Sequence, residues 1–358
     1  MTVSASSGFD ITAFSTTEKL FKFKKIQYHA EPLSDYQVYI KIKACGVCHT
    51  DMDFAGLPDT ILGHEAVGEI VQVGSKIESI KKGDLVGFAY MKSSCLDCLL
   101  CHSGDDIMCR KRKMFPEGLN NGYSYGAVCD GRFVYKIPEG IEAKHAGPLM
   151  CAGSTVFSAI YNANVKPTAR VAIVGIGGLG HLGLQFARAW GCHVTAISTS
   201  RDKEAEALKF GAHEYWCSKD FTPEYIEKAE KFDFILSTVA ADHDYNTFLN
   251  LLVPNGEFRL VGIPPSDIKF GPALPFLLDQ KKFTGAILGG RKINTLLLQF
   301  AARHNIRPQI EEFPMTVRGI EDAIHHLHSG KARYRAVLIA PEDEEEEKMV
   351  DYLYEAQR

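Results

Sequence analysis

The sequence lacks a long hydrophobic run, because no stretch approaches the roughly 18 apolar residues that a membrane-spanning helix needs. It also lacks a strong excess of either charge. With 40 basic and 44 acidic residues the net charge is −4, which gives no reason to expect nucleic acid or an anionic membrane as a partner. The opening Met-Thr-Val-Ser-Ala-Ser-Ser has no basic region followed by an apolar core. We therefore expect no secretory signal and a cytoplasmic protein.

The chain does have the length and the apolar content for two domains, each with its own core. It holds 358 residues, of which 46% are hydrophobic. It also holds ten cysteines. In a reducing compartment, these are better explained as metal ligands or free thiols than as disulfides.

A glycine-rich stretch in the middle of the chain predicts a dinucleotide site. Four apolar residues, 171–174, predict a buried strand, and Gly175-x-Gly177-x-x-Gly180 then opens a helix-compatible run. The first glycine permits the tight turn, the second lets the backbone approach a pyrophosphate, and the third allows close packing of helix on strand. Among 31 glycines a chance match is the alternative, but the strand before and the helix after favour nucleotide binding at the helix N-terminus, with Gly178 and Leu179 part of the site.

Strands and helices alternate from residue 171 to about 290, which predicts a doubly wound parallel sheet with helices on both faces. The expected strands are 171–174, 194–197, 232–236 and 258–261, and the expected helices are 180–190, 202–210, 222–231 and 242–252. Beyond this region we expect helices at 295–303 and 317–327, a strand at 333–339, and a solvated acidic extension at 342–347.

The end of the second expected strand bears on which dinucleotide binds. NAD enzymes usually place an acid near this position to hold the ribose 2′-hydroxyl. This chain has hydroxyl groups and cationic side chains there instead, which suit a 2′-phosphate and favour NADP(H). The alternative interpretation is a polar strand end followed by a helix cap. The residues concerned are Ser198, Thr199, Ser200, Arg201 and Lys203.

Two cysteine patterns lie in the first third of the chain. Cys45-Gly-Val-Cys48 alone could be a redox pair or half a zinc ribbon, but Gly63-His64-Glu65 follows it closely. A thiolate, an imidazole and carboxylates are what a catalytic zinc site uses, yet His64 could equally be an ordinary partly buried histidine. The second pattern puts four thiols within fifteen residues, which favours a closed structural zinc site over an iron–sulfur cluster or free thiols: Cys95, Cys98, Cys101 and Cys109.

From about residue 35 to 340 the chain resembles the zinc-containing medium-chain alcohol dehydrogenases, most closely their NADP-dependent branch similar to cinnamyl alcohol dehydrogenase. The resemblance rests on Gly46-Val-Cys-His-Thr-Asp51, Gly63-His-Glu65, the four-cysteine loop, Pro148-Leu-Met-Cys-Ala-Gly153, Gly175-Ile-Gly-Gly-Leu-Gly-His181, Ile197-Ser-Thr-Ser200 and Arg333-Tyr-Arg335. An isolated cysteine in an apolar segment, such as Cys151, is typical of a small core residue, but the resemblance implies that Cys151 is a metal ligand.

The resemblance implies the site residues. Cys48, His64 and Cys151 match the catalytic zinc ligands, and Glu65 matches a carboxylate that can act as an alternate ligand. Thr50 matches the hydroxyl that bonds the substrate oxygen, and Asp51 matches an acid close to the metal. The remaining implied cofactor contacts are His49 and Thr155.

The resemblance also implies the architecture, an α/β fold of two domains. Residues 1–151 and 291–358 would form a GroES-like, β-rich catalytic domain, and 152–290 an inserted Rossmann domain that binds NADP. The active site would lie in the cleft, and the far edge of the Rossmann sheet would join two chains into a homodimer. Two zinc ions per chain are implied, one catalytic and one structural.

One position departs from the family pattern. Asp53 stands where many members carry a histidine at the end of a proton relay, and a carboxylate is the weaker base near neutral pH. The main hypothesis is an NADPH-dependent reductase of aromatic or medium-chain aldehydes. The alternatives are a reductase of a conjugated alkene or iminium on the same scaffold, and an NADP-binding regulatory protein without catalysis.

Overall fold

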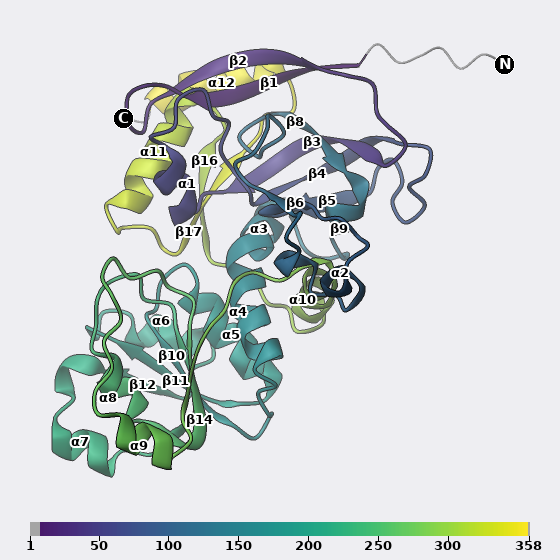
Figure 1. Cartoon of the computed structure of the whole chain (residues 1–358). Helices are drawn as coiled ribbons and strands as arrows, with labels where there is room; N and C mark the ends of the chain where they lie inside the picture. The colour runs from purple at the N-terminus through teal and green to yellow at the C-terminus, as the bar shows by residue number, and fades with distance from the viewer. Residues whose placement is uncertain (1–7, 357–358) are drawn as a thin grey trace. The chain divides into compact units, whose positions relative to one another are not determined.

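The computed structural model describes residues 8–356, which divide into two compact units (Figure 1). Unit 1 consists of Met1–Cys151, Gly290–Ala302 and Arg307–Arg358, and unit 2 of Ala152–Gly289 and Arg303–Ile306. These limits differ from the expected ones at Gly290 and in the short segment 303–306. Among the described residues, no helix is both long and apolar enough to cross a membrane.

Unit 1 is built on a seven-stranded sheet. Its strands run in the order β16-β17-β3-β4-β5-β9, with β8 also pairing with β3. The sheet strands are β3 (Gln37–Gly46), β4 (Ala66–Val73), β5 (Leu85–Phe88), β8 (Gly126–Asp130), β9 (Val134–Lys136), β16 (Ile310–Pro314) and β17 (Arg335–Ile339). Unit 1 also contains two two-stranded antiparallel sheets, β1 (Phe9–Thr16) with β2 (Phe23–Ala30) and β6 (Met91–Ser93) with β7 (Lys113–Met114).

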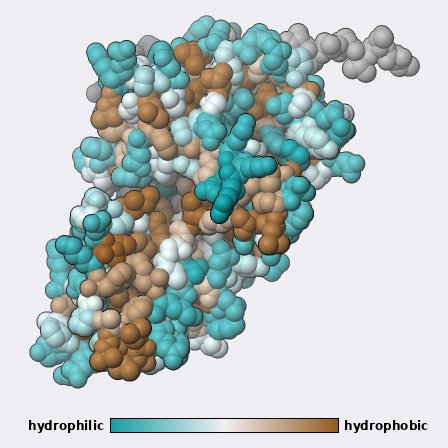
Figure 2. Space-filling model, in the orientation of Figure 1, coloured by the Kyte–Doolittle hydropathy of each residue, from teal (hydrophilic) through white to brown (hydrophobic). Residues whose placement is uncertain are grey.

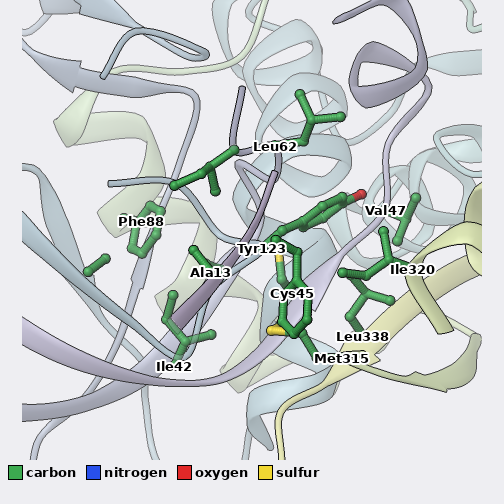
Figure 3. Close-up of a cluster of buried hydrophobic side chains, with 14 of the residues drawn as sticks. Ala13, Ile42, Cys45, Val47, Leu62, Phe88, Tyr123, Met315, Ile320 and Leu338 are labelled. Carbon is green, nitrogen blue, oxygen red and sulfur yellow. The ribbon is translucent and has the colours of Figure 1, made fainter. Parts of the chain in front are cut away.

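The helices of unit 1 are mostly short. They are α1 (His49–Phe54), α2 (Leu99–His102), α3 (Ala143–Pro148), α10 (Arg291–Arg303), α11 (Val317–His328) and α12 (Glu344–Ala356), with 3₁₀ turns at Asp106–Met108 and Gly131–Phe133. Strand β3 alternates buried and half-buried residues, because successive side chains of a strand point to opposite faces of the sheet. Its buried side chains join those of the other elements in one core, where Figure 3 shows Ile42 of β3, Phe88 of β5, Ile320 of α11 and Leu338 of β17.

Unit 2 contains the parallel sheet that the alternation predicts. The six strands run in the order β12-β11-β10-β13-β14-β15, and every neighbouring pair is parallel. They are β10 (Arg170–Val174), β11 (His193–Ser198), β12 (Glu214–Cys217), β13 (Phe232–Ser237), β14 (Leu252–Leu260) and β15 (Lys282–Gly285). This doubly wound sheet is the Rossmann arrangement.

The helices of unit 2 connect these strands. They are α4 (Ser154–Asn162), α5 (Gly180–Trp190), α6 (Glu204–Lys209), α7 (Pro223–Lys228), α8 (Tyr245–Leu249) and α9 (Ala273–Leu278), with a 3₁₀ turn at Ser218–Asp220. Helix α5 has the predicted bounds and ends at Gly191, whose φ of +102° suits a residue without a side chain. A π-helical turn, Leu149–Gly153, joins α3 to α4.

Three local expectations need correction. Helices α6, α7 and α8 are shorter than the helical patterns, and β14 begins at Leu252, inside the expected helix 242–252. The acidic extension is also not simply solvated. From Glu344 it forms α12, and Glu347, only 7% exposed, accepts hydrogen bonds from Lys25 Nζ at 2.7 and 2.8 Å, because a buried carboxylate needs a cationic partner.

Candidate active site

Four potential metal ligands converge in unit 1. Cys48 is the N-cap residue of α1, His64 and Glu65 directly precede β4, and Cys151 lies in the π-helical turn after α3. One ligand atom from each lies within 4.8 Å of all the others, and the two sulfur atoms are 3.9 Å apart. π-Helical turns are rare and occur often at functional sites, as this one does.

The unused polar atoms of this cluster fit a metal ion. His64 and Glu65 are 1% and 0% exposed, yet His64 Nε2 and Glu65 Oε2 have no hydrogen-bond partner. Leaving such atoms unsatisfied costs about 1–3 kcal/mol each, so a buried pair of this kind indicates a missing partner. Two sulfurs, one imidazole nitrogen and a carboxylate are a donor set typical of zinc.

Asp51 contacts four residues in and around the cluster. Its fully buried carboxylate accepts hydrogen bonds from the backbone N–H of Cys48 at 2.8 Å and of Gly63 at 3.0 Å. Tyr123 Oη donates to it at 3.3 Å, and His64 Nδ1 lies 3.3 Å from its Oδ1. A carboxylate beside the second nitrogen of a ligating histidine fixes the ring and raises its basicity.

Glu65 forms an ion pair with Arg335 of β17. Arg335 Nη2 donates to Glu65 Oε1, and both side chains are almost fully buried. The other carboxylate oxygen, Oε2, is left unbonded on the same side chain. Glu65 therefore has one oxygen held by a cation and one free for a metal.

Two glycines make room for this carboxylate. A Cβ atom at Gly46 would lie 1.9 Å from Glu65 Oε2, and one at Gly147 would lie 2.8 Å from the Glu65 carbonyl oxygen. Gly147 belongs to α3, the helix that leads to Cys151. Because Gly46 has no side chain, the Glu65 carboxylate can lie against it, and because Gly147 has none, α3 can pack against the Glu65 backbone.

Electrostatics in the cluster reflect its buried acidic groups. The hydrogen bond from Cys151 holds the pKa of the Cys48 thiol well below its usual value. Burial raises the pKa of the Glu65 carboxyl to about 7 against the opposing charge of Arg335. Buried negative groups need positive charge nearby, and a bound cation supplies it as the thiols lose their protons.

The four-cysteine loop forms a second cluster. One sulfur from each of Cys95, Cys98, Cys101 and Cys109 lies within 4.8 Å of the others. The shortest sulfur–sulfur distances are 3.5 Å, for Cys98 with Cys101 and for Cys109 with Cys95. Four sulfur ligands leave no open coordination position, so the chemistry of this set fits a structural zinc ion.

The glycine motif of unit 2 lies in the turn between β10 and α5. Gly175 has φ +86°, and a Cβ atom on Gly180 would lie 1.9 Å from the Gly175 carbonyl oxygen. No atom lies within 4 Å of a Cβ on Gly177, so the turn is open there. This is the cradle that a pyrophosphate needs at the N-terminus of α5, with Gly178 and Leu179 completing the turn.

The expected 2′-phosphate residues follow β11. Lys203 Nζ donates to the Ile176 carbonyl at 2.8 Å, which places the ammonium group beside the glycine turn. Arg201, in contrast, pairs with Asp220 at 2.8 Å and with Glu204 at 3.4 Å. Tyr215 Oη donates to the Ser200 carbonyl at 2.5 Å and so ties the segment to β12.

Other expected site residues lie on short helices. Thr50 is half-buried on α1, two residues after Cys48, whereas His49 and Asp53 are exposed on the same helix. Thr155 is 8% exposed on α4 in unit 2.

Comparisons with known proteins identify the family. Residues 34–139 match the alcohol dehydrogenase GroES-like domain, and 178–303 match the zinc-binding dehydrogenase domain. The aldehyde reductase AdhA of Synechocystis sp. is 39% identical over 337 residues, which cover 92% of this chain and 98% of that protein. The chain belongs to the zinc-containing medium-chain alcohol dehydrogenases, in the branch similar to cinnamyl alcohol dehydrogenase.

Solved structures of this family agree with the fold. The cinnamyl alcohol dehydrogenase SbCAD4 of Sorghum bicolor matches with a TM-score of 0.85 and 30% identity, covering 92% of this chain and 98% of that one. The CAD of Helicobacter pylori, solved with NADP(H), matches with a TM-score of 0.83 and 28% identity, covering 93% and 98%.

Sequence patterns alone missed several residues around this alcohol dehydrogenase site. The family motif contains Arg335 but does not assign it a role, and no sequence pattern indicates Tyr123, Gly147 or Tyr215. Arg335 and Glu65 are 270 positions apart, so no local spacing relates them. The one available signal for Arg335 was an arginine in an otherwise apolar strand.

Proposed function

We propose that this protein is a zinc-dependent aldehyde reductase that uses NADPH, acting reversibly on aromatic or medium-chain aldehydes and alcohols. The observation that carries the proposal is the buried convergence of Cys48, His64, Glu65 and Cys151, with two of their polar atoms unsatisfied. Three of these residues would be permanent zinc ligands, and the carboxylate of Glu65 is held by Arg335. The fourth coordination position of the zinc ion would then be open to a substrate oxygen.

Cys48, His64 and Cys151 would hold the catalytic zinc ion, and the glycine turn of unit 2 would hold NADPH. When bound, the ion polarises a carbonyl group as a Lewis acid and the nicotinamide supplies a hydride. Asp51 keeps His64 oriented through the contact at Nδ1. Glu65, anchored by Arg335, is an alternate oxygen ligand.

Proton transfer would begin at Thr50. Its hydroxyl can donate a hydrogen bond to the substrate oxygen and deliver the proton that completes an alcohol. In oxidation the same hydroxyl would receive the proton that the alcohol loses. Asp53, on the same helix, is the group of this chain that would exchange that proton with water.

The preference for NADPH rests on the residues after β11. Lys203 lies beside the glycine turn, and Ser198, Thr199 and Ser200 offer hydroxyl groups in place of the acid that holds a ribose 2′-hydroxyl. Arg201 is the weakest member of this set, because two carboxylates already pair with it. The relative from Helicobacter pylori that was solved with NADP(H) supports the same cofactor.

A second candidate function is reduction of a conjugated alkene or an iminium group. The observation that favours it is Asp53, because a chain without the relay histidine is less suited to deprotonating an alcohol. Hydride delivery to carbon does not need that deprotonation, so the scaffold could serve either reaction.

The two candidates are separated by identifying products. Cinnamaldehyde contains both a carbonyl and a conjugated double bond, so one substrate reports on both reactions. We expect cinnamyl alcohol with NADPH, and a rate with NADH at least 10-fold lower. A saturated aldehyde as the product would contradict the proposal and favour the second candidate, and equal rates with NADH would contradict the cofactor assignment.

We also propose that two copies of the chain form a homodimer through unit 2. Within the described residues β15 pairs only with β14, which leaves one edge of the sheet unpaired. The neighbouring segment exposes large apolar side chains, visible as a brown patch over α9 in Figure 2. They are Ile263, Phe270, Leu274, Leu277 and Leu278, each 55–79% exposed. A second copy that covers this patch would bury it and continue the sheet.

The ten cysteines are consistent with the cytoplasm as the proposed compartment. All of them are free thiols, and six belong to the two clusters. A reducing compartment keeps thiols available as metal ligands.

A further inference from the structure

A small cavity in unit 1, apart from both cysteine clusters, contains an amine and a thiol. Its volume is about 150 Å³. Its apolar wall includes Phe88, Met91 and Phe133, all buried, and its polar wall includes Lys92 of β6 and Cys129 of β8. None of the residues assigned to the catalytic or structural metal group lines it.

Lys92 is held in this wall by backbone carbonyls and not by an acid. Its Nζ donates to the carbonyl oxygens of Glu117 at 2.5 Å and of Asn120 at 3.1 Å. Asp130, which also lines the cavity, pairs with Arg132 at 2.6 Å. In the described part of the chain Lys92 has no ion-pair partner, whereas Lys281 pairs with Asp279 at 2.9 Å.

These contacts can be made by a neutral amine as well as by an ammonium group. Carbonyl oxygens can accept both N–H groups of a neutral amine, and the lone pair then takes the remaining direction on nitrogen. Burial lowers the pKa of Lys92 to about 8, against the opposing charge of the nearby Glu117 carboxylate. Burial also raises the pKa of the Cys129 thiol to about 12, so sulfur stays protonated and nitrogen is the available nucleophile.

We propose that this cavity is a second carbonyl-binding site, in which Lys92 forms a reversible imine with a small aldehyde. The nitrogen lone pair forms a C–N bond to the carbonyl carbon, and both amine hydrogens leave with the carbonyl oxygen as one water molecule. No oxidant or reductant is needed. After protonation the imine keeps one N–H for one carbonyl acceptor, and the released water can bond the other.

The site is independent of the proposed catalysis. It uses no metal ligand and no cofactor residue, so imine formation at Lys92 and NADPH-dependent turnover can each fail without the other. The size of the cavity restricts the partner to an aldehyde of a few heavy atoms, such as propanal, since a water molecule occupies about 30 Å³ in the liquid.

Reductive labelling tests the proposal. The zinc-loaded full chain is treated with propanal and cyanoborohydride, and propylation of each lysine is followed by peptide mass spectrometry. We expect Lys92 to react at least 10-fold faster at pH 7.5 than the exposed Lys82, because an ordinary lysine is almost wholly protonated there. The Lys92 rate should level off above about pH 8.

Lys92→Arg keeps a cation with donors at this position but cannot form an imine, and Lys82→Arg is the matched control. We expect the first substitution to remove the fast-reacting site and the second to leave it unchanged. The proposal is overturned if Lys92 reacts no faster than Lys82, or if its rate keeps rising well above pH 8.

Discussion

Single residues around the metal cluster have divided roles. In the proposed site Cys48, His64 and Cys151 would supply ligand atoms, whereas Asp51 and Arg335 hold neighbouring groups in position. The positioning contacts are buried, where a hydrogen bond to a charged group contributes about 1.5–3 kcal/mol. Substitutions at Asp51 or Arg335 would therefore disturb the ligands without removing one.

Asp53 gives the clearest prediction at this scale. We expect Asp53→His to raise the rate of alcohol oxidation at pH 7 by about one to two orders of magnitude, because imidazole is the better base there. Aldehyde reduction should change less. The measurement is the pH–rate profile in both directions, with Asp53→Asn as the control that adds no base. An unchanged oxidation profile in Asp53→His would show that this position takes no part in proton transfer.

At the scale of elements, sequence patterns predict best those elements whose structure depends on residues close together in the sequence. The strand β10, its glycine turn and the helix α5 follow from neighbouring residues, because Gly175 needs a positive φ and Gly180 packs on the Gly175 carbonyl. Cys95 to Cys109 are equally local, so their convergence could be expected from spacing.

Other elements depend on distant residues and could not be predicted in this way. The helix α12 was expected to be a solvated acidic tail, but Glu347 pairs with Lys25, which lies 322 positions earlier. The Arg335–Glu65 pair joins β17 to the segment before β4. A spacing rule carries no information on such pairs, since they depend on how the sheet of unit 1 is assembled.

For the whole molecule, the proposed homodimer makes a prediction about mass. We expect the wild-type chain to have the mass of two chains in light scattering, and the double variant Leu277→Asp, Leu278→Asp to have the mass of one. Charged side chains in a buried apolar contact lose hydration without gaining a partner. Leu20→Asp, at a leucine 60% exposed in unit 1, is the matched control and should remain dimeric. A wild-type monomer, or a double variant that stays dimeric, would rule out this interface.

The central claim is that Cys48, His64 and Cys151 hold a catalytic zinc ion, and metal content measured with activity tests it most directly. We predict about two zinc ions per wild-type chain, one in each cluster. Cys151→Ala should retain about one and lose NADPH-dependent aldehyde reduction by about 100-fold or more, because Lewis-acid catalysis contributes several kcal/mol. Cys192→Ala, at a buried cysteine outside both clusters, should keep both ions and the activity. Full zinc content or undiminished reduction in Cys151→Ala would contradict the account.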